Sequence, residues 1–215
     1  MTADSPERQL VLSYAPTAAR AGLAALLALD DTLSSLLRTS TDPALGQLRL
    51  AWWRESLAKL DHAPAPAEPV LKALQQEVVA RGISPKALVP LVHGWEVLVE
   101  EEHLDSEALT RFAEGRGQLF AAAGSVLGAA PTDPLAQAGR GWALVDLAAN
   151  LSRQEEAAAA RTHARPLLAE AARRHWSRNG RPLGAMAHLA RMKVEGDAGP
   201  VARIGRLLWH RLSGR

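Results

Sequence analysis

Apolar residues recur along this chain at the spacing of amphipathic helices. Between Ser84 and Glu102 they lie at i, i+3, i+4 and i+7, and charged side chains occupy the opposite face. Strong helix formers such as Ala, Leu, Glu and Arg dominate the whole sequence, and runs of β-branched residues are absent. The pattern therefore predicts an all-α protein.

Turn and capping residues divide this pattern into about eight or nine helices. Asp42-Pro43, Ser84-Pro85 and Asp133-Pro134 each place a capping side chain before a proline at the first helical position. Proline and glycine clusters at 63–66 and 179–182 end helices. Because no linker is long enough to separate independent units, we expect residues 1–215 to form a single helical domain.

Composition narrows the class of protein. The chain has 215 residues, of which 47% are hydrophobic and 22% charged, as in a globular protein with a core. It has no cysteine, which excludes disulfides, thiolate zinc sites and a cysteine nucleophile. No apolar stretch approaches the roughly 20 residues of a membrane span, and the N-terminus has no signal-peptide pattern. We therefore expect a cytoplasmic protein.

Charge is unevenly distributed. Residues 161–215, the predicted basic C-terminal helices, contain twelve Arg and Lys but three acids, a formal net charge of +9, whereas the first 160 residues carry −7. This asymmetry suggests an acidic partner, a membrane surface or nucleic acid, or else two oppositely charged parts of one fold. No nucleic-acid-binding motif accompanies the basic residues, so nucleic acid is not an expected partner.

The last helix, predicted over 200–212, is strongly amphipathic. Val201, Ile204, Leu208 and Leu212 cluster within about 80° of a helical wheel, and Arg203 lies opposite. A basic amphipathic helix is typical of a segment that lies on an anionic membrane, so peripheral membrane contact through 200–212 is one interpretation. The other, which we favour on sequence, is that the apolar face closes the helical bundle.

Few residues suggest chemistry. No histidine pair has the i, i+4 spacing of a helical metal site, and no glycine-rich loop follows a strand. Asp30 and Asp31 lie on a predicted long helix, but Ser34 and Ser35 occupy the positions one turn on, where a metal site would need further acids. Asp146, Asn150 and Arg153 are spaced to share one helix face. That face could bind a polar ligand or form a buried hydrogen-bonded network.

Several segments resemble a known family. The strongest contains Asp42-Pro43, Leu45-Gly46 and the run Leu48-Arg49-Leu50-Ala51-Trp52-Trp53-Arg54-Glu55. The likeness continues through SPKALVPLVHGWEVLVE, LTRFAEGRGQLFAAAGSVLG and AGRGWALVDLAANLSR, roughly over residues 8–170. These segments are similar to the squalene/phytoene synthase family, and in particular to its short bacterial branch, which resembles a mitochondrial complex I assembly factor.

The resemblance implies an isoprenoid synthase fold, a helical bundle around a central cavity. Active members condense two prenyl diphosphates head to head, with two Asp-rich helical motifs holding Mg²⁺. Alignment of the first motif places its acidic positions near Ser34, Ser35 and Arg38. In the second motif Asn150 and Arg153 match, but the two essential Asp positions fall on other residue types, Gln154 and Ala158. Both motifs therefore lack the acidic residues that hold Mg²⁺ in active members.

These departures lead to the functional expectation. The first hypothesis is a non-catalytic interaction or assembly factor, acting with a protein partner in respiratory complex I biogenesis and binding an isoprenoid lipid. It requires no metal and no cofactor. The alternative is an active prenyl transferase that uses Mg²⁺. Relic diphosphate or metal positions are Asp30, Asp31, Asp146, Asn150 and Arg153.

A second group of residues comes from the tryptophan segment. Arg49, Trp52, Trp53 and Arg54 are candidates for the cavity or the core. We expect at least one of the two tryptophans to pack in the core, the alternative being a lining of the lipid cavity. Arg49 is expected to pair with a buried carboxylate or a helix C-terminus.

Overall fold

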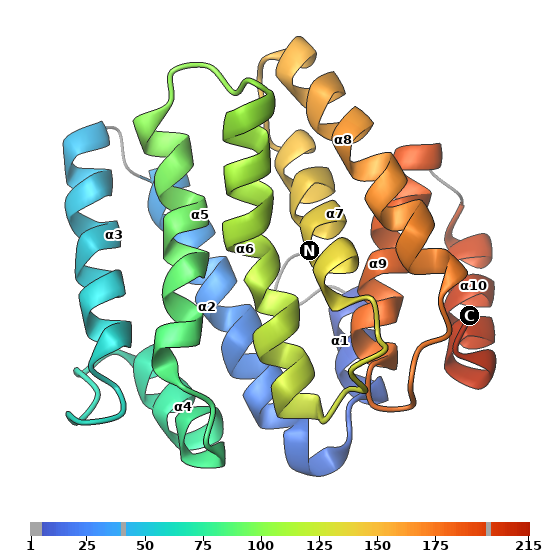
Figure 1. Ribbon diagram of the computed structural model, residues 1–215, viewed down its shortest axis with the longest axis horizontal. Helices are drawn as coiled ribbons and strands as arrows, with labels where there is room; N and C mark the ends of the chain where they lie inside the picture. Colours follow the sequence, from blue (N-terminus) through green and yellow to red (C-terminus); the bar gives the residue numbers. More distant parts are fainter. Residues whose placement is uncertain (1–5, 40–41, 197–198) are drawn as a thin grey trace.

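The computed structural model describes residues 6–39, 42–196 and 199–215, and within them every regular element is helical (Figure 1). The all-α prediction is confirmed. Over these residues there are ten α-helices instead of the expected eight or nine, and two of them, α1 and α4, are only nine residues long. The α-helices are α1 Pro6–Tyr14, α2 Arg20–Thr39, α3 Pro43–Ala58, α4 Pro69–Glu77, α5 Val89–Glu100, α6 Ser106–Leu127, α7 Leu135–Ala148, α8 Gln154–Arg173, α9 Arg181–Glu195 and α10 Pro200–Ser213.

Helices α5, α6 and α7 lie side by side at the centre of the bundle (Figure 1). Glycines permit their close approach. A Cβ atom on Gly115 of α6 would lie 2.6 Å from the Cα atom of Gly94 on α5, and one on Gly117 would lie 2.9 Å from a backbone nitrogen of α7. Gly115 and Gly117 therefore serve close helix packing, and Arg116 between them lies in the interior.

The predicted caps are partly confirmed. Asp42 accepts a hydrogen bond from the backbone N–H of Ala44 (2.9 Å) and caps α3. Ser84 makes no such bond, because Pro85 opens a 3₁₀ turn, Pro85–Leu88, ahead of α5. Asp133 does not cap α7 either: its carboxylate accepts from the backbone N–H of Ser177 (2.7 Å) and ties two loops together.

Helix α3 lies at one edge of the bundle, so only one of its faces is buried (Figure 1). Trp53 lies on that face with 5% of its surface exposed, which confirms the core prediction for one tryptophan. Trp52 is 45% exposed and is not a core residue. The expectation for Arg49 was wrong, because its side chain lies on the solvent side of α3. Arg54 pairs at the surface with Glu96 (2.6 Å).

The C-terminal helix α10 packs at the opposite end of the molecule from α3, against α9 (Figure 1). The interpretation that its apolar face closes the bundle was wrong. Leu207 and His210 are the residues it buries, and Arg203 of the same face pairs with Glu7 of α1 (3.0 Å). The apolar face, including Val201, is turned to solvent.

None of the helices in the described ranges has both the length and the apolar character needed to cross a lipid bilayer.

Candidate functional site

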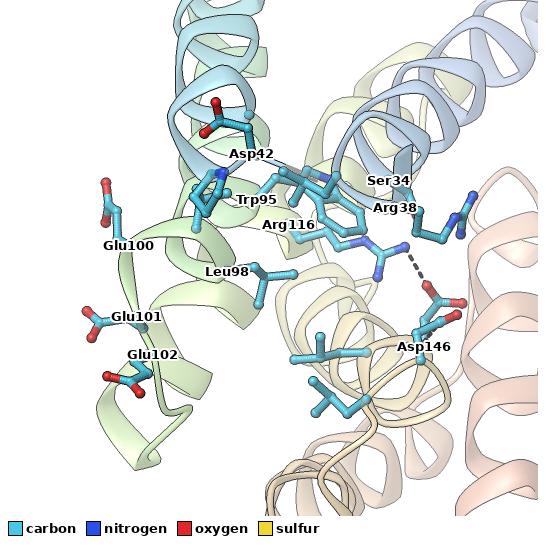
Figure 2. A pocket seen from close by; sticks show the side chains of 17 residues that line it. Ser34, Arg38, Asp42, Trp95, Leu98, Glu100, Glu101, Glu102, Arg116 and Asp146 are labelled. Atoms are coloured by element: carbon cyan, nitrogen blue, oxygen red, sulfur yellow. Dashed lines mark hydrogen bonds and ion pairs between the residues drawn. The ribbon is translucent and has the colours of Figure 1, made fainter. Parts of the chain in front are cut away.

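Two adjoining cavities lie between helices of the bundle, and Arg116 lines both; Figure 2 shows the larger one. The larger cavity, of about 560 Å³, is bounded by α2, α3, α5, α6 and α7. The smaller, of about 320 Å³, lies between α1, α2, α6 and α7. Residues that line both are Ser34, Arg38, Arg116, Asp146 and Asn150.

Arg116 joins carboxylates from two different helices. Its Nε donates to Oδ1 of Asp30 (2.8 Å) and its Nη2 to Oδ2 of the same carboxylate (2.7 Å), which makes a bidentate pair. The Nη2 atom also lies 2.8 Å from Oδ2 of Asp146, the contact drawn in Figure 2. Arg116 is 2% and Asp30 4% exposed. The cation thus connects α2, α6 and α7 inside the bundle.

Aromatic rings hold the guanidinium from both sides. Its Cζ atom lies 4.5 Å from the ring centroid of Trp95 and 4.4 Å from that of Trp142, within the range of cation–π attraction. The Nε1–H of Trp95 also donates to Asp30 (3.3 Å). Among the described residues, the buried Nη1 atom of Arg116 has no hydrogen-bond partner. One strong donor is therefore left unsatisfied inside the bundle.

The protonation states follow from these contacts. Burial alone would raise the pKa of Asp146, but nearby positive charge, chiefly the Arg116 guanidinium, lowers it, and the pKa lies below its usual range. Burial lowers the pKa of Arg116, whereas the carboxylates of Asp30 and Asp146 raise it. The net effect is a rise. Burial raises the pKa of Asp31, although an ion pair with Arg8 of α1 opposes the shift. Arg116 and Asp146 are both charged at neutral pH.

The structure brings together four of the five relic positions. Asp30, Asp31, Asp146 and Asn150 all line the smaller cavity, whereas Arg153 lines neither cavity.

The predicted common face of Asp146, Asn150 and Arg153 was wrong, because α7 ends at Ala148. Asn150 donates its Nδ2–H to the backbone oxygen of Asp146 (2.7 Å) and so binds a terminal carbonyl of α7. Arg153 is the N-cap residue of α8 and contacts Glu156 (3.1 Å) and the backbone oxygen of Glu102 in the loop between α5 and α6 (2.8 Å).

The remaining motif positions also differ in location. Ser34, Ser35 and Arg38, the positions of the first acidic motif, line the cavities with hydroxyl and guanidinium groups in place of carboxylates. Gln154 and Ala158, the positions of the second motif, are exposed on α8 and line neither cavity. The second motif therefore lacks the acidic residues, and its positions also lie outside both cavities.

Sequence reasoning missed Arg116 as the central residue. A signal was present, because Arg116 lies one turn from both Phe112 and Phe120 on the apolar face of α6. An arginine at such a position, between two glycines that allow close packing, requires buried counter-charges.

The residues present do not fit Mg²⁺. Hard divalent cations need several carboxylate oxygens at one point, and no group of three or more His, Asp or Glu in the described ranges is arranged to hold a metal. Asp30 and Asp146, the carboxylates deepest in the cavities, are both already bound to a guanidinium.

Comparisons with known proteins give one finding. A family model described as squalene/phytoene synthase matches residues 1–157, which are most of the chain and include every residue that lines the two cavities around Arg116. No curated protein and no solved structure matches the chain.

Proposed function

The chain belongs to the squalene/phytoene synthase family, and from that premise we propose that it is a non-catalytic member that binds a neutral isoprenoid lipid and works as an assembly factor with a protein partner. The family match and the all-α bundle support an isoprenoid synthase-type fold. The loss of catalysis and the ligand class are argued below from the site itself.

The observation that carries the proposal is the ion pairing of Arg116 with Asp30 and Asp146. A metal ion that took these carboxylates would have to break a buried pair, which costs about 3–5 kcal/mol because one charge is left uncompensated. Ionisation of a prenyl diphosphate needs strong counter-charge for the leaving group. Arg116 is already neutralised twice, and Arg38, the other guanidinium that lines both cavities, adds a single positive charge in place of several metal ions.

The surroundings of the cavity favour a neutral ligand. Its wall is largely apolar, with Leu37, Leu98 and Leu151 among the lining residues, which suits a hydrocarbon chain. Its mouth carries the carboxylates of Asp42, Glu100, Glu101 and Glu102, the last three pointing outward in Figure 2. Arg111 pairs with two of these carboxylates, Glu100 and Glu101, but the four acids still outnumber it, so a diphosphate is disfavoured there and a neutral hydroxyl or carbonyl group is not.

A protein partner is supported by the surface of α3. Leu45, Leu48 and Trp52 form a row on the helix, each at least 41% exposed. Contiguous exposed apolar side chains are typical of protein interaction sites, with tryptophan a frequent anchor. By the resemblance of the tryptophan segment to the short branch of the family, we assign this row to a partner in respiratory complex I biogenesis. Leu48→Ser should abolish co-purification with complex I intermediates.

Turnover and ligand binding test the central proposal. The purified protein with Mg²⁺ and farnesyl or geranylgeranyl diphosphate should release no more diphosphate than a protein-free control. Native mass spectrometry should detect binding of farnesol in preference to farnesyl diphosphate. Turnover that is lost in Asp146→Asn, with the fold retained, would establish the alternative, an active prenyl transferase.

A further inference from the structure

The outer face of α10 is a continuous apolar surface. The α10 stripe consists of Val201, Ile204, Leu208, Trp209 and Leu212, which are between 49% and 85% exposed. Gly205 lies within it, and nothing occupies the space next to its Cα atom. Single exposed apolar side chains are normal on a protein surface, but five on one face of a helix form a contiguous patch. Such a patch marks a surface that a partner covers.

A cavity that is rich in arginine adjoins the end of this stripe. It has a volume of about 530 Å³, and Leu212 of the stripe is one of its lining residues. The arginine pocket is defined by its four guanidinium groups, which come from α2, the α8–α9 loop, α9 and α10: Arg20, Arg178, Arg181 and Arg211. No carboxylate lines it, so its charge is strongly positive.

Protein contacts orient three of these arginines without neutralising them. Arg20 donates to the backbone oxygen of Leu12 (3.1 Å), Arg181 to that of Arg211 (2.6 Å), and Arg211 stacks on Tyr14 at 5.0 Å. Within the described ranges none of the four forms an ion pair with a carboxylate.

The pocket also lies beside the N-terminus of α9, where the helix dipole adds positive potential. Clustered guanidinium groups with unused donors are the chemistry that binds phosphate oxygens.

We propose that this end of the protein docks on an anionic phospholipid surface, with the α10 stripe inserted among the acyl chains and the arginine pocket holding lipid phosphate groups. The two features are continuous through Leu212, so one surface can present both at once. Helices that lie in the membrane interface combine an apolar face with adjacent arginines in this way. The formal charge of +9 over residues 161–215 gives long-range attraction of the same sign.

Charge also argues against a second copy as the partner that covers the stripe. A twofold contact through the stripe would place two basic C-terminal regions against one another, each with a formal charge of +9 over residues 161–215. Like charges opposed across an interface disfavour association. An anionic membrane instead provides both an apolar layer and the phosphate groups that the surface lacks.

Vesicle co-sedimentation of the full chain at low salt tests the proposal. The protein should bind vesicles of phosphatidylcholine mixed with phosphatidylglycerol and not those of phosphatidylcholine alone. Ile204→Ser with Leu208→Ser should weaken binding more than about 100-fold, as expected for two large apolar side chains. Arg178→Gln should weaken it about fivefold, and Arg178→Gln with Arg211→Gln about 25-fold.

Matched controls lie on α3, at the other end of the molecule (Figure 1). Leu48→Ser and Arg49→Gln make the same chemical changes at exposed positions and should leave vesicle binding unchanged. All these variants should keep the melting temperature of the parent, because the substituted side chains are exposed.

Three results would overturn the proposal. One is equal binding to both kinds of vesicle. Another is saturable binding of inorganic phosphate to the pocket without any vesicle binding, which would make it a site for free phosphate. The third is a dimer that dissociates in Ile204→Ser with Leu208→Ser and ignores vesicles. None of these results depends on whether the cavities around Arg116 bind a neutral lipid or turn over a diphosphate. This proposal and the proposed function can therefore fail separately.

Discussion

Substitution of Arg116 by methionine tests the central ion pair directly. Methionine fills much of the same space between Trp95 and Trp142 but leaves Asp30, which is 4% exposed, without its counter-charge. Removal of one partner from a buried pair costs about 3–5 kcal/mol, much more than the 0–1 kcal/mol of a surface pair. For a chain of this length the loss corresponds to a fall of about 6–20 °C in melting temperature.

The pH dependence distinguishes loss of charge from loss of packing. In Arg116→Met the unpaired buried carboxylate has a folded-state pKa above its unfolded value, so its ionisation destabilises the fold at neutral pH. As the pH falls toward the unfolded pKa, this carboxylate becomes protonated and the difference between parent and variant should shrink. A packing defect would give a difference that does not depend on pH.

Urea unfolding followed by circular dichroism measures both effects. Arg111→Met is the matched control, because Arg111 lies on the same helix and its pairs with Glu100 and Glu101 are at the surface. The control should lose at most about 1 kcal/mol. Addition of Asp30→Asn to Arg116→Met should restore part of the lost stability. A loss below 1 kcal/mol in Arg116→Met, or no coupling between the two sites, would refute the buried-pair argument.

Three further predictions concern packing and protonation. Trp53→Ala should destabilise by about 3–5 kcal/mol and Trp52→Ala by less than about 1 kcal/mol in the same unfolding assay, because only the first ring is buried; equal losses would contradict this difference. Gly115→Ala should lose about 1–3 kcal/mol despite the better helix propensity of alanine, since the new methyl group meets the backbone of α5; a stabilised variant would contradict the close approach. Burial lowers the pKa of His188 to about 3 and that of His210 to about 4, so the stability they contribute is complete above pH 6.5 and is lost as the pH falls toward these values. Unfolding at pH 5 should show a loss of about 2 kcal/mol per histidine, which His188→Gln with His210→Gln should remove.

The helical architecture could be predicted because its signals are local. The periodicity before Glu100 and the capping carboxylates of Asp42 and Asp105 act within a few residues of the helices that they define. Ser84 and Asp133 failed as caps for a reason outside that range. Asp133 bonds to a loop 44 residues further on, a contact that no local pattern contains.

The site was only half predictable for the same reason. Asp30 and Asp146 could be proposed as cavity residues from motif positions, but the residue that joins them is 86 positions from Asp30 along the chain. Its role appears only once α5, α6 and α7 are packed together. For Arg153 the sequence predicted a neighbour of Asp146 that the structure does not bring close. The i, i+7 spacing places two residues on one face only within a continuous helix, and α7 ends at Ala148.

The orientation of α10 about its own axis could not be predicted from its amphipathic pattern. The pattern identifies two faces but not which of them meets the bundle. A half turn of α10 about its axis would bury the stripe, but it would break the Arg203–Glu7 pair and pull His210 away from Trp176 and His188. Those contacts hold the polar face inward and leave Ile204 and Leu208 in water, at a cost of about 25 cal/mol per Å² of apolar surface. A covering partner with an apolar surface removes that cost, and the positive charge around the stripe favours a partner that is also anionic.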